Sequence, residues 1–382
     1  MKLNGLSLFA NVGMAETYLH DVGIDIRVAN ELLEERANFY THLYPNATMI
    51  VGDITDDETY ERVIQTAKKE NVNFLIATPP CQGMSLAGKM DKDDVRNQLI
   101  YYAIKAIKDL KPNYVLLENV PQQLRTWVNF DNERMLIPDY MHKELSENYH
   151  FAEQSLVSAR DYGVPQMRKR NIVLLSRKDM NYKWEMPKPY GYEIPLKDAL
   201  KDVPSLDPLL KEGLSETLKL FPDYETKKAA GLAVSKWHYP PTHSKKLVET
   251  MMHTPSGCTA HDNEIFYPKK DDGTRVNGHY NTYRRFSWDK PSRTITQNSA
   301  VMSSLCCVHP GYKLSDGPTE KERIYSDARC FSIYELLIVS SLPLDWNIPE
   351  WASDKLIRSV IGEGIPPLLV KNIAKELTSH IG

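Results

Sequence analysis

The sequence has few cysteines, no long apolar run and little net charge, and each of these absences excludes a class of protein. The five cysteines, at positions 81, 258, 306, 307 and 330, are odd in number and include no C-x-x-C pair, which indicates neither a disulfide framework nor a zinc site. No apolar stretch approaches the roughly 20 residues that cross a bilayer. The first nine residues lack the basic start and apolar core of a signal peptide. We therefore expect a cytoplasmic protein without a membrane anchor and without a metal.

The charge balance excludes very little. The 47 basic and 50 acidic residues give a net charge of −3, which neither indicates nor excludes a nucleic-acid ligand, because a local basic cleft is sufficient to bind one. With 382 residues, of which 42% are hydrophobic, the chain can bury a sizeable core and is long enough for two lobes.

The first part of the chain has the pattern of an α/β protein. Up to about residue 120, short apolar runs alternate with amphipathic helical stretches, which predicts a doubly wound, mainly parallel sheet. The predicted strands are Gly5–Ala10, Ile26–Asn30, Phe74–Thr78, Tyr114–Glu118, Leu156–Ser158 and Asn171–Ser176. In such folds the chemistry lies where the strands end.

The second part is irregular. From about 187 to 320 the chain carries many prolines, several histidines and little periodicity. Periodicity returns at 332–341 and 366–379, and the last helix is expected to pack on the sheet through one apolar face, formed by Leu368, Leu369, Ile373, Ala374 and Leu377. We predict a sheet domain at 1–186 and 352–382 and a smaller, irregular domain at 187–351.

Two strand ends carry reactive side chains. Cys81 follows a predicted strand on a proline-containing turn, A-T-P-P-C-Q-G-M-S, where a nearby dipole or cation could lower its pKa from about 8.5. Glu118 ends the next predicted strand, and neighbouring strands lie about 5 Å apart. The two side chains could therefore share one pocket. Taken singly, Cys81 could instead be a buried structural cysteine, and Glu118 a cap or solvated turn residue.

The N-terminal turn indicates a nucleoside site. Leu6–Gly13 reads L-S-L-F-A-N-V-G, a strand and a turn of small residues, before a predicted helix containing Ala15–His20. Glu31 follows about 20 residues later, where an acidic residue commonly accepts ribose hydroxyls. The turn has one glycine where dinucleotide-binding turns have three, so we expect a ligand without phosphates and not the cofactor of a dehydrogenase.

Four motifs resemble those of one family. P-P-C-Q, E-N-V, Q-M-R-K-R at Gln166–Arg170 and G-E-G-I-P-P at Gly362–Pro367 occur in the order found in DNA cytosine-5 methyltransferases. The resemblance covers 6–176 and about 290–377, and the unmatched middle resembles the family's target-recognition region. It implies a Rossmann-like methyltransferase domain that uses S-adenosylmethionine on double-stranded DNA. The family's usual setting is a bacterial restriction-modification system with a companion endonuclease, and we expect a monomer.

The resemblance implies a role for each catalytic residue. Cys81 matches the nucleophile that adds to cytosine C6, and Glu118 matches the acid that protonates or hydrogen-bonds N3 and the exocyclic amine. Such an addition makes C5 reactive toward a methyl sulfonium. Arg168 and Arg170 match arginines that support cytosine O2 and the thiolate, with Arg170 closer to the base. By composition alone both arginines could be surface charges after a turn.

The resemblance also implies a cofactor site. Phe9 matches an aromatic residue beside the adenine, Glu31 a carboxylate on the ribose and Asp53 an acid on the adenine amine, although Phe9 could equally be a core residue. The other positions expected at this site are Asn11, Gly13, Ile54, Pro79, Leu99, Asn119 and Glu363. Asn11 replaces a common glycine and Glu363 replaces the usual asparagine. The carboxylate of Glu363 could pair with the cofactor's ammonium group or with a cation of the protein.

A cytosine inside a duplex must be flipped out to reach Cys81. Residues expected to contact the DNA are Gln82, Ser85, Arg284 and Arg285, with Lys245, Lys246, Lys269, Lys270 and Tyr283 as further candidates. Each of them could instead be a solvated surface residue. Arg329–Glu335, R-C-F-S-I-Y-E, resembles an architectural segment of the family, with tyrosine where arginine is usual.

Two alternatives stay open at this point. A transfer-RNA cytosine-5 methyltransferase would share the catalytic motifs, although the long, distinct second lobe favours DNA. A silent DNA-binding homologue would have lost a catalytic residue, whereas Cys81, Glu118 and both arginines are present.

Overall fold

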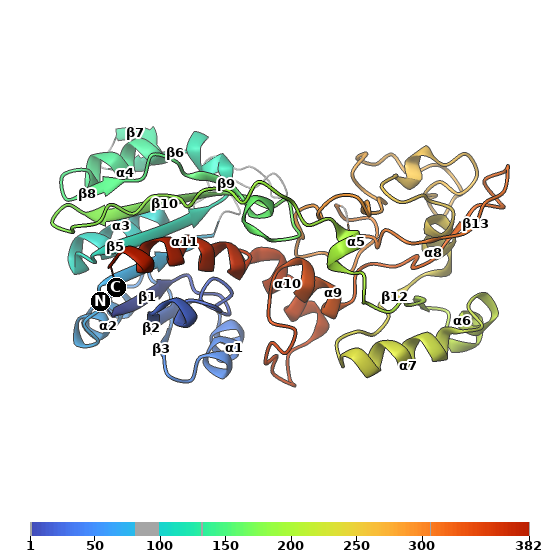
Figure 1. Ribbon diagram of the computed structural model, residues 1–382, viewed down its shortest axis with the longest axis horizontal. Helices are drawn as coiled ribbons and strands as arrows, with labels where there is room; N and C mark the ends of the chain where they lie inside the picture. Colours follow the sequence, from blue (N-terminus) through green and yellow to red (C-terminus); the bar gives the residue numbers. More distant parts are fainter. Residues whose placement is uncertain (1, 81–98, 131–132, 306, 382) are drawn as a thin grey trace.

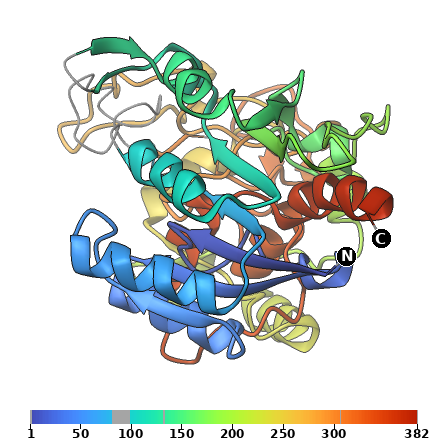
Figure 2. The same ribbon diagram turned by 90° about the vertical axis from the view of Figure 1, so that its left-hand side faces the viewer.

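The computed structural model describes residues 2–80, 99–130, 133–305 and 307–381. The chain forms two lobes, one built on a large sheet and one of loops and short helices (Figure 1). The two ends of the chain lie close together on the sheet lobe in Figure 1 and in Figure 2. Within the described ranges, no helix is long and apolar enough to cross a membrane.

The sheet lobe is built on one mixed sheet. Its strand order is β3-β2-β1-β4-β5-β10-β8, with β9 also paired to β10. The strands are β1 (Leu3–Leu8), β2 (Ile24–Glu31), β3 (Thr48–Val51), β4 (Phe74–Ala77), β5 (Tyr114–Asn119), β8 (Tyr149–Phe151), β9 (Leu156–Ser158) and β10 (Lys169–Arg177). β1 to β5 are parallel, and β10 runs antiparallel to β5, β8 and β9. The doubly wound α/β fold predicted from the sequence is confirmed.

The strand order indicates where a ligand binds. β1 lies between β2 and β4, so the chain winds outward in one direction through β2 and β3 and in the other through β4 and β5. In open α/β sheets, ligands bind beyond the carboxyl ends of the strands at such a switch point. The turn after β1, Glu31 at the end of β2 and Glu118 near the end of β5 all lie at this edge.

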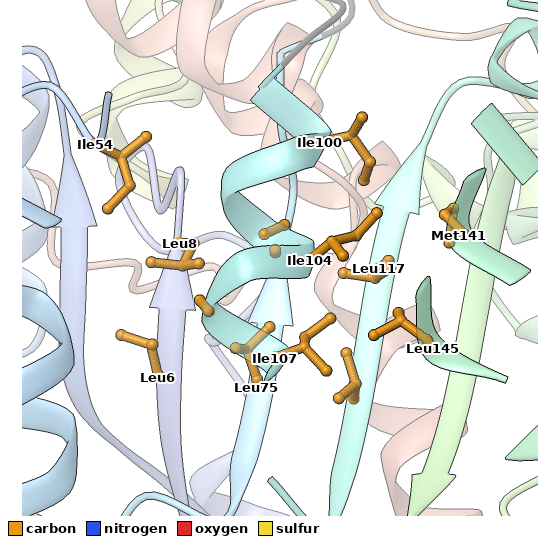
Figure 3. Packing of buried hydrophobic residues seen from close by; sticks show 14 of the residues in the cluster. Leu6, Leu8, Ile54, Leu75, Ile100, Ile104, Ile107, Leu117, Met141 and Leu145 are labelled. Atoms are coloured by element: carbon orange, nitrogen blue, oxygen red, sulfur yellow. The ribbon is translucent and has the colours of Figure 1, made fainter. Parts of the chain in front are cut away.

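Helices cover both faces of the sheet. α2 (Asp57–Lys69), α3 (Leu99–Leu110) and α4 (Ile137–Leu145) contribute to one core, in which Ile104 and Ile107 of α3 lie over Leu75 and Leu117 (Figure 3). The C-terminal helix α11 (Pro367–Ile381), drawn in red, covers the opposite face (Figure 2). It buries Leu369, Ile373, Ala374 and Leu377. The terminal helix therefore packs on the sheet as its pattern predicted. α1 (Glu34–Leu43) lies beside β3.

The segment after the first turn does not form the helix predicted to contain Ala15–His20. Glu16 N–H donates to Gly13 O and Leu19 N–H to Glu16 O, so these bonds span three residues instead of four, and a short 3-10 helix, η1 (His20–Val22), follows. The hydroxyl of Thr17 donates to Met14 O. Such side-chain bonds to the backbone compete with regular helix formation.

Among the described residues of the second lobe, the strands have two or three residues and the helices at most 11, and loops connect them, as the irregular sequence indicated. These elements are α5 (Leu196–Ala199), β11 (Leu209–Leu210), α6 (Leu214–Leu220), α7 (Tyr224–Val234), β12 (Thr242–His243), α8 (Lys245–Met252), η5 (Ala260–Asp262), β13 (Lys313–Ser315), β14 (Ile324–Tyr325) and α9 (Ile333–Val339). The remaining elements, in the sheet lobe, are η3 (Pro121–Arg125), the β6–β7 hairpin (Trp127–Phe130 and Glu133–Leu136) and η4 (Ala159–Tyr162).

A buried ion cluster organises the start of α9. Arg329 lies 2.7 Å from Asp327 and 2.7 Å from Glu335, and all three side chains are fully buried. Glu335 also accepts a hydrogen bond from Ser332 N–H and completes a capping box at the start of α9. The segment Arg329–Glu335, which was predicted to be architectural, therefore fixes the start of α9.

The two lobes share a core around α9 and α10 (Asp354–Glu363). Val12, Met14 and Phe39 from the sheet lobe pack in one cluster with Phe286 and Ile295 from the second. Met167 N–H also donates to Ser292 O between the lobes. The junction is thus a packed interface, and the domain boundaries at 186 and 352 stay predictions.

Candidate active site

Glu118 and Arg170 form an ion pair at the end of the sheet. Asn119 lies opposite Asn171 in the β5–β10 register, and alternate residues face opposite sides of the sheet, so Glu118 and Arg170 share a face as diagonal neighbours. Nε of Arg170 lies 2.6 Å from Oε1 of Glu118, and both side chains are about nine-tenths buried. The structure thus brings together the predicted acid and the arginine expected closer to the base.

Asn119 connects this strand end to the segment that leads to Cys81. Its side-chain amide donates to Pro79 O at 3.2 Å, and its oxygen accepts from Val120 N–H at 2.8 Å. Pro79 and Asn119 are therefore in direct contact, and their expected place at the cofactor site stays a prediction. Cys81, Gln82 and Ser85 lie outside the described residues, so their roles stay predictions.

The contacts of Arg168 differ from those expected of an arginine that supports cytosine O2 and the thiolate. Its guanidinium donates to Ile295 O at 2.9 Å, Gly362 O at 3.0 Å and Glu363 O at 2.7 Å, and its side chain is buried. These carbonyls belong to the second lobe and to the end of α10. The contacts favour a positioning role, in which Arg168 fixes the junction beside the Glu118–Arg170 pair.

The turn after β1 wraps around Glu31. Asn11 N–H donates to Glu31 Oε2 at 2.8 Å, and Leu33 N–H donates to Oε1 at 3.0 Å. Phe9 and Asn11 have φ angles of 58° and 52°, and Gly13 has a φ of 80°. A Cβ on Gly13 would lie 2.2 Å from the ring of Tyr44, so glycine is required there both by its conformation and by the available space.

The predicted adenine-side residues are only partly brought together. Asp53 is exposed beyond β3, and its carboxylate accepts from Thr55 N–H at 2.9 Å. Ile54 is buried in the main core, and Phe9 and Leu99 pack against that core while partly exposed. The burial of Ile54 indicates a packing role, while Asp53 stays available at the crevice edge.

Glu363 faces a cation of the protein. Its Oε2 lies 2.7 Å from Nη1 of Arg36, and its Oε1 accepts from Nη2 of Arg36 at 2.9 Å. Asn11 Nδ2 also donates to Oε2, at 3.1 Å. Sequence reasoning missed Arg36, because no motif spacing connects α1 with a residue more than 300 positions away.

The two arginines expected to bind DNA lie in different surroundings. Arg284 is partly exposed, donates to Gly257 O at 2.6 Å and lies 4.8 Å from the ring of Tyr280. Arg285 is buried, and its guanidinium donates to the carbonyls of Met251, Ser326, Asp327 and His309. This burial argues against the expected DNA contact of Arg285, whose guanidinium instead holds three backbone segments together.

The remaining basic candidates are mostly engaged with neighbours. Lys245 pairs with Glu216, Lys246 donates to Lys270 O, and Lys269 lies over the ring of Tyr267. In the part of the chain that the structure describes, no group of three or more His, Cys, Asp or Glu side chains is arranged to hold a metal.

The fold and the strand-end residues define a class of protein, the Rossmann-like methyltransferases. Over residues 3–379 the chain matches the model of the C-5 cytosine-specific DNA methylases, and it belongs to that family. It is therefore a DNA cytosine-5 methyltransferase, of a family that uses S-adenosylmethionine.

Individual relatives cover the whole chain. The type II methyltransferase M1.HgaI of Avibacterium volantium is 42% identical over a 385-residue alignment that covers 99% of each chain. The type II methyltransferase M.DdeI of Desulfomicrobium norvegicum is 24% identical over 98% of this chain and 88% of that protein.

Solved structures share the fold. A protein encoded within an E. coli prophage superposes with a TM-score of 0.66 at 20% identity, covering 100% of this chain and 99% of that one. DNMT2 of Spodoptera frugiperda superposes with a TM-score of 0.59 at 18% identity, over 98% of this chain and 99% of that one.

Proposed function

We propose that this chain is the modification enzyme of a type II restriction-modification system, and that it methylates one cytosine within a specific double-stranded sequence. The observation that carries the chemistry is the Glu118–Arg170 pair, at 2.6 Å, at the edge where β4 leads toward Cys81. The near full-length similarity to M1.HgaI supports the restriction-modification setting.

Glu118 is proposed to hold the pyrimidine ring. Arg170 occupies Oε1, and no described residue donates a hydrogen bond to Oε2. That oxygen can therefore meet N3 or the exocyclic amine of a flipped cytosine. Arg170 fixes the carboxylate and brings a positive charge to the place where the ring gains electron density.

Cys81 is proposed to add to C6 of the flipped base as a thiolate, while Glu118 supplies a proton or hydrogen bond at N3. This addition makes C5 nucleophilic. Bound S-adenosylmethionine supplies the electrophilic methyl group. Loss of the C5 proton and of Cys81 then restores the aromatic ring and releases the enzyme.

The residues around the first turn fit a nucleoside cofactor. Glu31 is buried at the end of β2 and accepts two backbone hydrogen bonds, which hold its carboxylate in place for the ribose hydroxyls. We propose that Asp53 faces the adenine amine and that Phe9, Pro79 and Asn119 line the crevice. Gly13 allows the turn to fold tightly beneath it.

The second lobe is proposed to read the DNA sequence. Nη2 of Arg284 donates a hydrogen bond to Gly257 O, and the guanidinium lies over the ring of Tyr280, a residue that is more than half exposed. An arginine fixed in this way suits a planar contact with a base edge or a phosphate. We propose that the protein acts on DNA as a monomer in the cytoplasm.

The test is methyl transfer from labelled S-adenosylmethionine to duplex DNA, with total transfer RNA as the alternative substrate. We expect label in DNA only, and bisulfite sequencing of DNA from expressing cells should reveal one recurring sequence. Label in transfer RNA alone would overturn the DNA assignment. DNA binding without transfer, and without a covalent adduct on 5-fluorocytosine duplexes, would instead indicate a silent binding protein.

A further inference from the structure

The carboxylate of Glu363 is saturated by donors from three elements. It receives two nitrogens of Arg36 from α1, Nδ2 of Asn11 from the turn after β1, and the hydroxyl of Ser359 from α10 at 3.3 Å. Both side chains of the ion pair are about one-fifth exposed. Glu363 is thus neutralised within the protein, and its charge is not free to hold a ligand's cation.

This arrangement fixes which way the Asn11 amide faces. An ionised carboxylate can only accept hydrogen bonds, so Asn11 must turn its NH₂ group toward Glu363. Its carbonyl oxygen, Oδ1, then faces away from Glu363. That atom is buried and has no hydrogen-bond partner among the residues that the structure describes. A buried acceptor without a donor is costly, which indicates that a ligand supplies the donor.

Asn11 also touches the proposed ribose site. Its backbone N–H donates to Glu31, while its side chain binds Glu363. The same residue therefore lies between the carboxylate proposed for the ribose and the α10 end of the crevice.

We propose that Oδ1 of Asn11 accepts a hydrogen bond from the ammonium group of the cofactor's methionine moiety, and that Glu363 and Arg36 are positioning residues that hold Asn11 in this orientation. The inference rests on the proposed cofactor site. An ammonium group offers only donors and Oδ1 is only an acceptor, so the two are complementary. Glu363 acts through Asn11 and does not bind the cofactor itself.

The experiment measures equilibrium binding of two ligands by calorimetry. S-adenosylhomocysteine carries the amino-acid group, whereas 5′-methylthioadenosine shares the adenosine and thioether but lacks it. In Asn11→Gly the turn keeps its shape, because glycine readily adopts the φ of 52° found there. We expect roughly tenfold or greater weakening for S-adenosylhomocysteine, as for loss of a hydrogen bond to a charged group, and no change for 5′-methylthioadenosine.

Two further variants sharpen the test. Asn71→Gly replaces another asparagine of left-handed conformation, with a φ of 51°, on an exposed turn, and should leave both affinities unchanged. Glu363→Gln lets the Asn11 amide turn over, because glutamine can accept or donate, and should selectively weaken S-adenosylhomocysteine by a smaller factor.

The outcomes separate the inference from the proposed function. Unchanged S-adenosylhomocysteine binding in both Asn11→Gly and Glu363→Gln, in a protein that still methylates DNA, overturns the inference alone. Equal weakening of both ligands in Asn11→Gly also overturns it, since the whole turn would then have been disturbed. A wild-type protein that binds neither ligand would overturn the proposed cofactor site as well.

Discussion

Glu118 and Arg170 lie diagonally across β5 and β10, with Nε of the arginine 2.6 Å from Oε1 of the glutamate. This relationship gives Glu118 a fixed orientation and a counter-charge in a largely buried place. It follows from the antiparallel register of the two strands, because a slip of one residue would turn Arg170 to the other face.

The first prediction concerns the charge on Glu118. Glu118→Gln keeps the shape but removes the acid, and we expect turnover to fall at least about 100-fold, the scale of lost general acid catalysis. DNA affinity should stay within a few-fold of wild type. Steady-state kinetics and a gel-shift titration measure the two quantities. Glu144→Gln, at an ion pair on α4 remote from the crevice, is the control. A variant with more than a tenth of the wild-type turnover would contradict the proposed role.

The second prediction concerns the nucleophile. Cys81→Ser should abolish turnover and the covalent adduct with 5-fluorocytosine DNA, because a serine hydroxyl is a far weaker nucleophile than a thiolate at neutral pH. Binding of unmodified DNA should persist. Cys258→Ser, at a partly exposed cysteine of the second lobe, should behave like wild type. Retained methylation in Cys81→Ser would refute the assignment.

The sequence predicts the sheet well and the contacts between distant segments poorly. Strands such as Phe74–Ala77 are buried apolar runs, so their positions follow from the local pattern of the sequence. Arg36 and Glu363 are far apart in the chain, and Arg168 is bound to carbonyls of residues 295, 362 and 363. Neither contact can be predicted from the hydrophobic periodicity of the sequence or from a local motif. Arg284 and Arg285 are adjacent in sequence and differ in burial, which composition cannot reveal.

The third prediction concerns the junction of the lobes. A Cβ on Gly362 would lie 2.3 Å from the carbonyl carbon of Thr296 and 2.4 Å from Gln297 N, so backbone must move. We expect Gly362→Ala to lower the free energy of unfolding by about 1 to 3 kcal/mol, the cost typical of overpacking. Turnover should fall too, because Arg168 binds Gly362 O.

Urea unfolding and kinetics of the same preparations test this prediction. Gly273→Asn is the control, since no atom lies within 4 Å of its added Cβ and asparagine tolerates the φ of +83°. Unchanged stability in Gly362→Ala would contradict this prediction, because it would show that the two lobes can move apart at Gly362 without a loss of free energy of unfolding.

The fourth prediction concerns a buried acid beneath the cofactor turn. Glu16 is almost fully buried, accepts a hydrogen bond from the Ser7 hydroxyl, and has a second oxygen without a partner among the described residues. Burial raises the pKa of Glu16 from 4.5 to about 7. The folded protein therefore retains a proton that the unfolded chain loses between these two pH values.

The sign of the effect follows from that difference in proton binding. Between pH 4.5 and 7 the folded state binds more protons, so the contribution of Glu16 to the free energy of unfolding falls as the pH rises. The full change in the free energy of unfolding is about 3 kcal/mol, because each unit of difference in pKa corresponds to about 1.36 kcal/mol.

Glu16→Gln keeps the side chain neutral at every pH. We expect this variant to be no more stable than wild type at pH 5, and its stability relative to wild type to be higher at pH 8. Urea unfolding at both pH values measures the difference, with Glu58→Gln, exposed on α2, as the control. Parallel pH dependence in wild type and Glu16→Gln would mean that the Glu16 carboxyl does not titrate in this range, and the turn would then carry a buried charge at neutral pH.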